Sequence, residues 1–82
     1  MTSKEKNELQ QQFGATVRST RSAKDLTVRE LSRNCNLDHS KISKIEKGKI
    51  NVTLATLVEL AFGLGVHPSE LLRGDFKGLT IG

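Results

Sequence analysis

Hydrophobic residues recur along the chain at the three- and four-residue spacings that place side chains on one face of a helix. Leu9, Phe13 and Val17 follow each other at intervals of four, which predicts an amphipathic first helix. The letters TSKE at 2–5 have the pattern of a capping box, in which a Thr and a Glu satisfy free amides at the start of a helix. We therefore expect a helix over about residues 3–23, with fraying at its start.

Two short helices are predicted next. Thr27 is a suitable N-cap for a helix over residues 28–35, with a Glu three residues later as its capping-box partner. Asp38 is a suitable N-cap for a helix over residues 39–47. Gly48 follows it in the position where a left-handed residue ends a helix.

The most apolar part of the chain lies near its C-terminal end. A fourth helix is predicted over residues 54–64, between the N-cap Thr53 and the terminating Gly65. Its sequence LATLVELAFGL is apolar around most of its circumference, so we expect it to be the central buried element. His67 and Pro68 then suit the cap and first turn of a short fifth helix. Because strand patterns are nearly absent, the sequence predicts an all-α fold of five helices.

The second and third helices are so close in sequence that they must meet at a sharp angle. The turn between them needs a residue that tolerates positive φ, and Asn36 is the best candidate. Leu37 is expected to lie beneath the turn, and Ile42 and Ile45 to face the core. The outward face of the third helix carries His39, Ser40, Ser43, Lys44 and Lys47. The isoleucines would therefore fix a helix that offers a row of hydrogen-bond donors and cations to a partner.

Length and charge narrow the class of protein. A chain of 82 residues builds one small domain. It has 13 Lys and Arg against 9 Asp and Glu, a net charge of +4 and a pI of about 9.6, which favours a polyanionic partner. Its one cysteine excludes an internal disulfide, and no apolar run is long enough for a signal peptide or a membrane span. A cytoplasmic protein is therefore expected. Because the chain has no Trp or Tyr, it lacks the stacking platforms of single-strand binders.

One long stretch carries a resemblance to a known family. It reads LTVRELSRNCNLDHSKISKIEKGKINVTLATLVELAFGLGVHPSELL and includes ISKIEKGK in register. Because they contain this stretch, residues 13–72 resemble the lambda-repressor-like, Cro-type helix-turn-helix domains of the XRE family. The resemblance implies a compact five-helix domain whose recognition helix, about residues 39–47, enters the major groove of DNA. It also implies a homodimer on a palindromic operator. The shortest members, including controller proteins of restriction-modification systems and small phage repressors, consist of little more than this domain. We therefore expect a transcriptional regulator that binds double-stranded DNA, and not an enzyme.

The resemblance also implies roles for single residues. Base edges would be read by His39, Ser40 and Lys44. Phosphates would be contacted by Thr27, Arg29, Lys41, Ser43, Lys47 and Lys49. Arg21 and Glu46 match a family pair that ties the first helix to the end of the recognition helix by a salt bridge. Where the family often has a Gln that holds a phosphate, this chain has Val28, so Arg29 or backbone amides would have to substitute.

Other classes of function find little support in the sequence. Cys35 and His39 have the spacing of two metal ligands on a helix, but the turn separates them and no second pair completes a zinc site. No nucleophile, base and acid form a catalytic set, and GLG at 63–65 ends a helix without following a strand. We expect no cofactor, metal or small-molecule ligand. The remaining alternative is an antitoxin-type protein-interaction module whose DNA binding is secondary.

Three parts are expected along the chain. They are an N-terminal extension of the first helix at 1–12, the DNA-binding domain at 13–73 and a C-terminal tail at 74–82. A dimer interface must leave the third helix free, so it should lie at the opposite end of the domain. We expect it to use residues 50–52, Leu71 and Leu72 of the fifth helix, and the tail side chains Phe76, Leu79 and Ile81.

Overall fold

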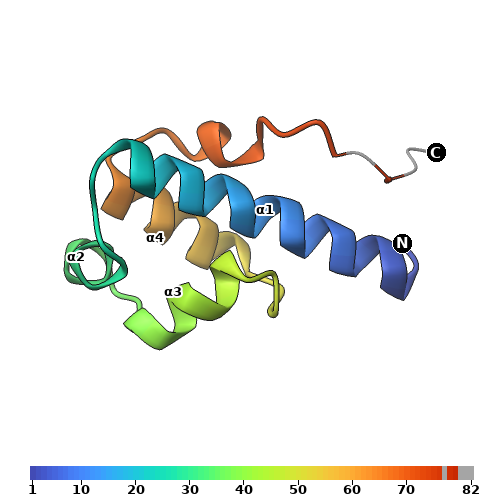
Figure 1. Ribbon diagram of the computed structural model, residues 1–82, viewed down its shortest axis with the longest axis horizontal. Helices are drawn as coiled ribbons and strands as arrows, with labels where there is room; N and C mark the ends of the chain where they lie inside the picture. Colours follow the sequence, from blue (N-terminus) through green and yellow to red (C-terminus); the bar gives the residue numbers. More distant parts are fainter. Residues whose placement is uncertain (77, 80–82) are drawn as a thin grey trace.

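The chain folds into four α-helices and one short 3-10 helix. A computed structural model describes residues 1–76, 78 and 79. In chain order the elements are α1 (Ser3–Ala23), α2 (Val28–Asn34), α3 (His39–Glu46), α4 (Leu54–Leu64) and the 3-10 helix η1 (Pro68–Leu72) (Figure 1). The described residues contain no strand, which confirms the all-α class. The long helix α1 packs against α3, α4 and η1, and α4 also packs against α2 and η1.

The capping signals in the sequence mark the helix starts. Thr2 and Thr27 both form complete capping boxes, each with the Glu three residues later. Asp38 and Thr53 cap α3 and α4 with their side-chain oxygens. Gly65 ends α4 in the left-handed conformation, with φ of 70°, because a residue without Cβ adopts this conformation at little cost. The predicted boundaries of α1 to α4 are confirmed to within one residue.

The fifth element differs from the predicted helix in its type. His67 caps it as expected, its Nδ1 accepting a hydrogen bond of 3.1 Å from the Ser69 amide, and Pro68 occupies the first turn. The five residues of η1 form a 3-10 helix, with a backbone bond from the Glu70 amide to the His67 carbonyl. A segment this short has little room for the four-residue bonds of an α-helix, so the tighter three-residue pattern forms.

The prediction of a left-handed Asn36 in the turn between α2 and α3 is wrong. Among the described non-glycine residues only Asp25 and Phe76 have positive φ. The chain instead leaves α2 through Cys35 in an extended conformation, with φ of −143° and ψ of 170°. The Ser32 hydroxyl donates a 2.7 Å bond to the Leu37 carbonyl across the turn. The Asn36 amide lies 3.3 Å from Glu59 Oε2 on α4, so tertiary bonds shape this turn without a left-handed residue.

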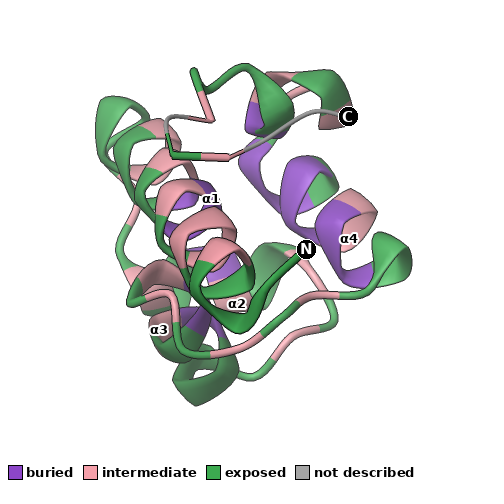
Figure 2. Cartoon of the chain, turned by 90° about the vertical axis from the view of Figure 1, so that its right-hand side faces the viewer, coloured by how far each residue is buried: buried purple, intermediate pink, exposed green. Residues whose placement is uncertain are grey.

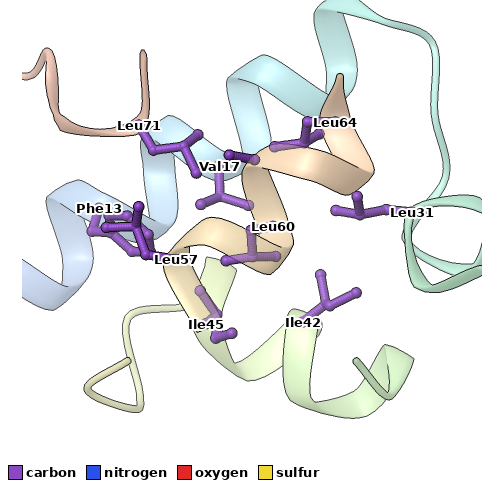
Figure 3. Packing of buried hydrophobic residues seen from close by; sticks show 10 residues of the cluster. Phe13, Val17, Leu31, Ile42, Ile45, Leu57, Leu60, Leu64 and Leu71 are labelled. Atoms are coloured by element: carbon purple, nitrogen blue, oxygen red, sulfur yellow. The ribbon is translucent and has the colours of Figure 1, made fainter. Parts of the chain in front are cut away.

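The core gathers around α4. Figure 3 shows Leu60 at the centre of the labelled side chains, with Val17 of α1 on one side and Ile45 of α3 on the other. Leu60, Val17 and Ile42 have no exposed surface, and Ile45 is 1% exposed. Leu37 is half-buried against this cluster. The expected inward faces of α3 and of the turn are thus confirmed.

The prediction that α4 is the central buried element is confirmed, although two of its apolar side chains face solvent. Leu54 is 77% exposed and Phe62 is 69% exposed. Figure 2 shows most of α4 as buried, with exposed segments among the buried ones.

Two expectations about the C-terminal region are also modified. Leu71 is 1% exposed and belongs to the core, so it is not available to a partner. Gly74 and Asp75 border a pocket whose other walls are Glu8, Gln12, Ala15 and Thr16 of α1, and the tail therefore returns along α1 (Figure 1). Phe76 and Leu79 are half-buried within the single chain, and Ile81 lies outside the described residues.

Candidate nucleic-acid interface

The outward face of α3 presents three residues that the sequence assigned to base reading. His39, Ser40 and Lys44 are exposed, while Ile42 and Ile45 fix the opposite face of the helix in the core. The N-terminal turn of α3 carries the His and the Ser, and Lys44 lies one turn further on. The structure therefore brings these three side chains together on one accessible helix.

The N-cap of α3 uses part of the hydrogen-bonding capacity of this face. Asp38 Oδ2 accepts a 3.2 Å bond from the Ser40 amide and a second, short bond from the Ser40 hydroxyl. The bond from the Ser40 hydroxyl, followed by the bond from the amide, lowers the pKa of Asp38 below its usual value. Because the Ser40 proton is donated to Asp38, the Ser40 oxygen presents lone pairs, which suit a donor such as a cytosine or adenine amino group.

Four of the residues assigned to phosphates lie on α3 or directly after it. Lys41, Lys47 and Lys49 are exposed, and Ser43 is half-buried. Gly48, with φ of 73°, directs the chain after α3, and a Cβ there would lie 2.7 Å from Gln11 Cα of α1. A glycine is therefore needed for the close approach that places Lys47 and Lys49 beside α3.

At the start of α2, Thr27 and Glu30 are hydrogen-bonded to each other in a capping box. Thr27 Oγ1 accepts from the Glu30 amide at 3.1 Å, and the Thr27 amide donates to Glu30 Oε1 at 2.9 Å. The bond from the Thr27 amide to the Glu30 carboxylate, followed by a hydrogen bond with the Thr27 side chain, lowers the pKa of Glu30. The Thr27 amide is therefore not available to a phosphate, whereas the Arg29 side chain is exposed on the first turn of α2.

Arg21 and Glu46 are joined by a two-pronged ion pair. Arg21 Nε lies 2.7 Å from Glu46 Oε2, and its Nη2 lies 3.0 Å from Glu46 Oε1. The remaining terminal nitrogen donates a 2.7 Å bond to the Leu26 carbonyl. The side chains are only 14% and 7% exposed, and the hydrogen bond to Glu46 raises the pKa of Arg21. The pair fixes the end of α3 to α1 and to the loop before α2.

Sequence reasoning missed two residues that shape this site. Gly14 lies where α1 crosses α3, and a Cβ at this position would lie 2.1 Å from the Ile45 carbonyl oxygen. Arg18 borders a pocket that also includes Ser43 and Lys47 of the α3 region. Its spacing of three residues from Arg21 places both arginines on neighbouring positions of one helix face, a signal by which Arg18 could have been found.

Cys35 is a partly buried thiol whose Sγ lies 3.2 Å from the Leu31 carbonyl oxygen. Burial raises its pKa, which disfavours the reactive thiolate. Within residues 1–76, 78 and 79, no group of three His, Cys, Asp or Glu side chains is arranged to hold a metal ion. In the same part of the chain, no helix has the length and apolar character needed to cross a membrane.

Comparison with known proteins places the chain in a family. A helix-turn-helix domain family matches residues 12–73. Control protein C.BamHI of Bacillus amyloliquefaciens is 38% identical over 77 residues, which cover 93% of this chain and 90% of the relative. Control protein C.MunI of a Mycoplasma species is 36% identical over 66 residues, which cover 79% of this chain and 89% of the relative.

A solved structure supports the same placement. The crystal structure of the restriction-modification controller protein C.AhdI from Aeromonas hydrophila matches the chain with a TM-score of 0.73 and 35% sequence identity. The match covers 76% of this chain and 94% of that one. The chain therefore belongs to the helix-turn-helix domain family and is an XRE-type regulator, as its resemblance to lambda-repressor-like domains predicted.

Proposed function

We propose that the chain is a sequence-specific regulator of transcription that binds double-stranded DNA with α3 in the major groove. The observation that carries this proposal is the two-sided character of α3. Ile42 and Ile45 are buried, and the opposite face exposes a His, a Ser and three Lys. The major groove admits an α-helix and offers base-specific acceptors and donors to such side chains. The relatives that are named control proteins support a role in gene control.

Each exposed side chain has a role that suits its chemistry. Lys44 donates to guanine O6 or N7, Ser40 accepts from a base amino group, and His39 serves as donor or acceptor. The phosphate backbone is contacted by Thr27, Arg29, Lys41, Ser43, Lys47 and Lys49. Only the side chain of Thr27 is available to contact a phosphate, because its amide donates to Glu30. This role requires binding alone, without catalysis or a cofactor, and it places the protein in the cytoplasm with its DNA.

The proposal predicts that removing a lysine that contacts bases and removing a lysine that contacts phosphates have different effects on DNA binding. For the unmodified protein, the logarithm of duplex affinity should fall with the logarithm of salt concentration by about 0.9 for each phosphate neutralised. Lys44→Ala should cost about 1–3 kcal/mol on the operator and relax the preference at one base position. Lys47→Ala should weaken binding to all duplexes alike and make the salt dependence less steep. Fluorescence anisotropy on the operator and on a scrambled duplex measures both quantities.

The two variants serve as controls for each other. Each removes one exposed lysine from the same end of the domain, so a general loss of charge would affect them equally. Equal losses on both duplexes would contradict the assignment of Lys44 as a base reader. An affinity of the unmodified protein that does not change with salt would contradict DNA binding itself.

We further propose that the protein binds a palindromic operator as a homodimer. One recognition helix reads few base pairs, whereas two copies would read half-sites about 34 Å apart. An apolar pocket of about 160 Å³ supports an interface away from α3, since its walls include Ile50, Val52 and Leu72 and no residue of α3. The pocket is lined by residues of α1, of the loop between α3 and α4, of α4 and of η1. Leu72 lines this pocket and is 47% exposed. In the proposed interface it therefore replaces Leu71, which is buried.

Sedimentation at micromolar concentration tests where the dimer forms. Leu72→Glu places a charge in the interface and should give a monomer with weaker binding to the palindrome, because burying an unpaired carboxylate is costly. Phe62→Glu is the matched control, since Phe62 is also exposed but does not border the pocket, and it should remain a dimer. A monomer from Phe62→Glu and a dimer from Leu72→Glu would place the interface on α4. A wild-type protein that stays monomeric on a palindromic duplex would exclude the dimer.

The same proposal assigns parts to the chain. Residues 13–73 form the DNA-binding domain, residues 1–12 extend its first helix, and residues 74–82 form a tail. Gly74 and Asp75 line a pocket together with residues of α1, which supports a tail that belongs to its own subunit. Removal of residues 75–82 should therefore leave the dimer intact in the same sedimentation experiment.

A further inference from the structure

A second surface feature lies beside the recognition helix, between α1 and α3. It is a pocket of about 230 Å³ lined by Arg18, Arg21, Val28, Ser43, Glu46 and Lys47. The residues come from the second half of α1, the first position of α2, and the C-terminal half of α3 with its cap. The pocket therefore lies where α1, the start of α2 and the end of α3 meet, beside the proposed DNA-binding surface.

The charges around this pocket do not cancel. Arg21 and Glu46 neutralise each other through their ion pair. Arg18 and Lys47 are exposed, and neither takes part in an ion pair within the described residues. Val28 is half-buried and contributes no polar side-chain atom. Two positive charges and the Ser43 hydroxyl thus line a mainly polar hollow, in which Val28 is the one apolar residue.

We propose that this pocket receives a phosphate group of the DNA backbone, held between Arg18 and Lys47. The inference rests on the proposed function and adds α1 to the DNA-binding surface. A guanidinium binds two phosphate oxygens in a fixed geometry, whereas an ammonium acts as a point charge. The Arg21 side chain remains bound to Glu46 and holds α1 and α3 in a constant relation. A phosphate bound at Arg18 would therefore set the position of α3 relative to the groove.

DNA fits this pocket better than a free anion does. Both unpaired cations are exposed, so their attraction for a lone ion in solution is screened by water and salt. A phosphate of a bound duplex is already held near the pocket by the contacts of α3, which gives it a high effective concentration. The site is therefore expected to act only as part of the larger interface.

The test compares Arg18→Gln with Lys6→Gln. Lys6 is an exposed cation on the same helix, about 18 Å nearer the N-terminus at a rise of about 1.5 Å per residue, so its loss removes the same charge at a distance from the pocket. Arg18→Gln should reduce the slope of log affinity against log salt by about 0.9. The ratio of wild-type to variant affinity should then be about 3.5 times as large at 50 mM salt as at 200 mM. Lys6→Gln should leave the slope unchanged, and Arg18→Lys should retain it.

The outcomes separate this inference from the proposed function. A wild-type protein with steep, salt-dependent binding and an Arg18→Gln variant with the same slope would overturn the phosphate site at Arg18 alone. Wild-type binding that is absent or independent of salt would overturn the proposed function. Inorganic phosphate at constant ionic strength should cause no saturable change in the amide NMR signals of Arg18 and Lys47. A saturable change that also releases DNA would show that the pocket binds a free anion and would overturn the assignment to DNA.

Discussion

Replacement of Glu46 by alanine is expected to lower the free energy of unfolding by about 3–5 kcal/mol, because it leaves a largely buried Arg21 without its partner. Arg21 is 14% exposed and is bound to both carboxylate oxygens of Glu46. Truncation therefore leaves two guanidinium donors unpaired, and only the bond to the Leu26 carbonyl remains. In a domain of this size each 1 kcal/mol lowers Tm by about 4–8 °C. Urea unfolding followed by circular dichroism measures the change.

Glu70→Ala is the matched control for this experiment. Glu70 Oε1 lies 3.1 Å from Arg73 Nη2, but the two side chains are 41% and 71% exposed. An exposed ion pair contributes about 0–1 kcal/mol, so this variant should unfold close to the wild type. A Glu46→Ala variant that loses no more stability than Glu70→Ala would show that the pair between α1 and α3 is not a structural link. The double variant Arg21→Met, Glu46→Leu should recover part of the loss, because no buried charge remains unpaired.

The features of the fold that the sequence predicted best are those that depend on neighbouring residues. Thr2, Thr27, Asp38 and Thr53 each cap a helix through the residues that directly follow them. The apolar spacing of Ile42 and Ile45 likewise identified the buried face of α3. Capping and amphipathic spacing act over one or two turns, so a single sequence contains them in full.

The features that the sequence did not predict depend on contacts between distant segments. The turn before α3 is shaped by the bond from the Asn36 amide to Glu59 and by the approach of Asn34 Nδ2 to the Gly63 carbonyl at 3.4 Å. These partners lie more than twenty residues away along the chain. Local preference favoured a left-handed asparagine at Asn36, but the tertiary bonds favour a different conformation. Among the described non-glycine residues, positive φ occurs instead at Asp25, in the turn between α1 and α2, with φ of 55°, and at Phe76, with φ of 54°.

In the candidate site, too, some features depend on neighbouring residues and others on contacts between distant segments. The exposed row on α3 followed from the helical period, and the Arg21 and Glu46 pair followed from the family resemblance. The bond between Ser40 and Asp38 could not be inferred, since it requires the side-chain rotamers at the cap. The position of Arg18 beside Lys47 also depends on how α1 crosses α3. That crossing depends on Gly14, for which no local sequence pattern predicted a role.

Gly14→Ala is expected to destabilise the protein by about 3 kcal/mol, although alanine is the better helix former. In an exposed helix this change would contribute about 1 kcal/mol of stability. Gly14 is buried, however, and a Cβ there would lie 2.1 Å from the Ile45 carbonyl oxygen and 2.8 Å from the Glu46 carbonyl oxygen. Both obstructing atoms belong to the backbone of α3, so no rotamer change relieves the overlap and the two helices must move apart. Overpacking of this kind typically costs about 1–3 kcal/mol and sometimes more, and here it also opposes the ion pair next to the contact.

Gly74→Ala provides the control, because a Cβ at this position would lie 4.0 Å from Thr16 Oγ1, in ordinary van der Waals contact. Its stability should match that of the wild type in the same urea titration. Displacement of α3 should additionally weaken operator binding by Gly14→Ala at temperatures where the variant remains folded, since Lys44 and Lys47 move with the helix. A Gly14→Ala protein that is as stable as the wild type would mean that helix propensity outweighs the overlap at Ile45. In that case the close crossing of α1 and α3 would not be what holds the recognition helix in place.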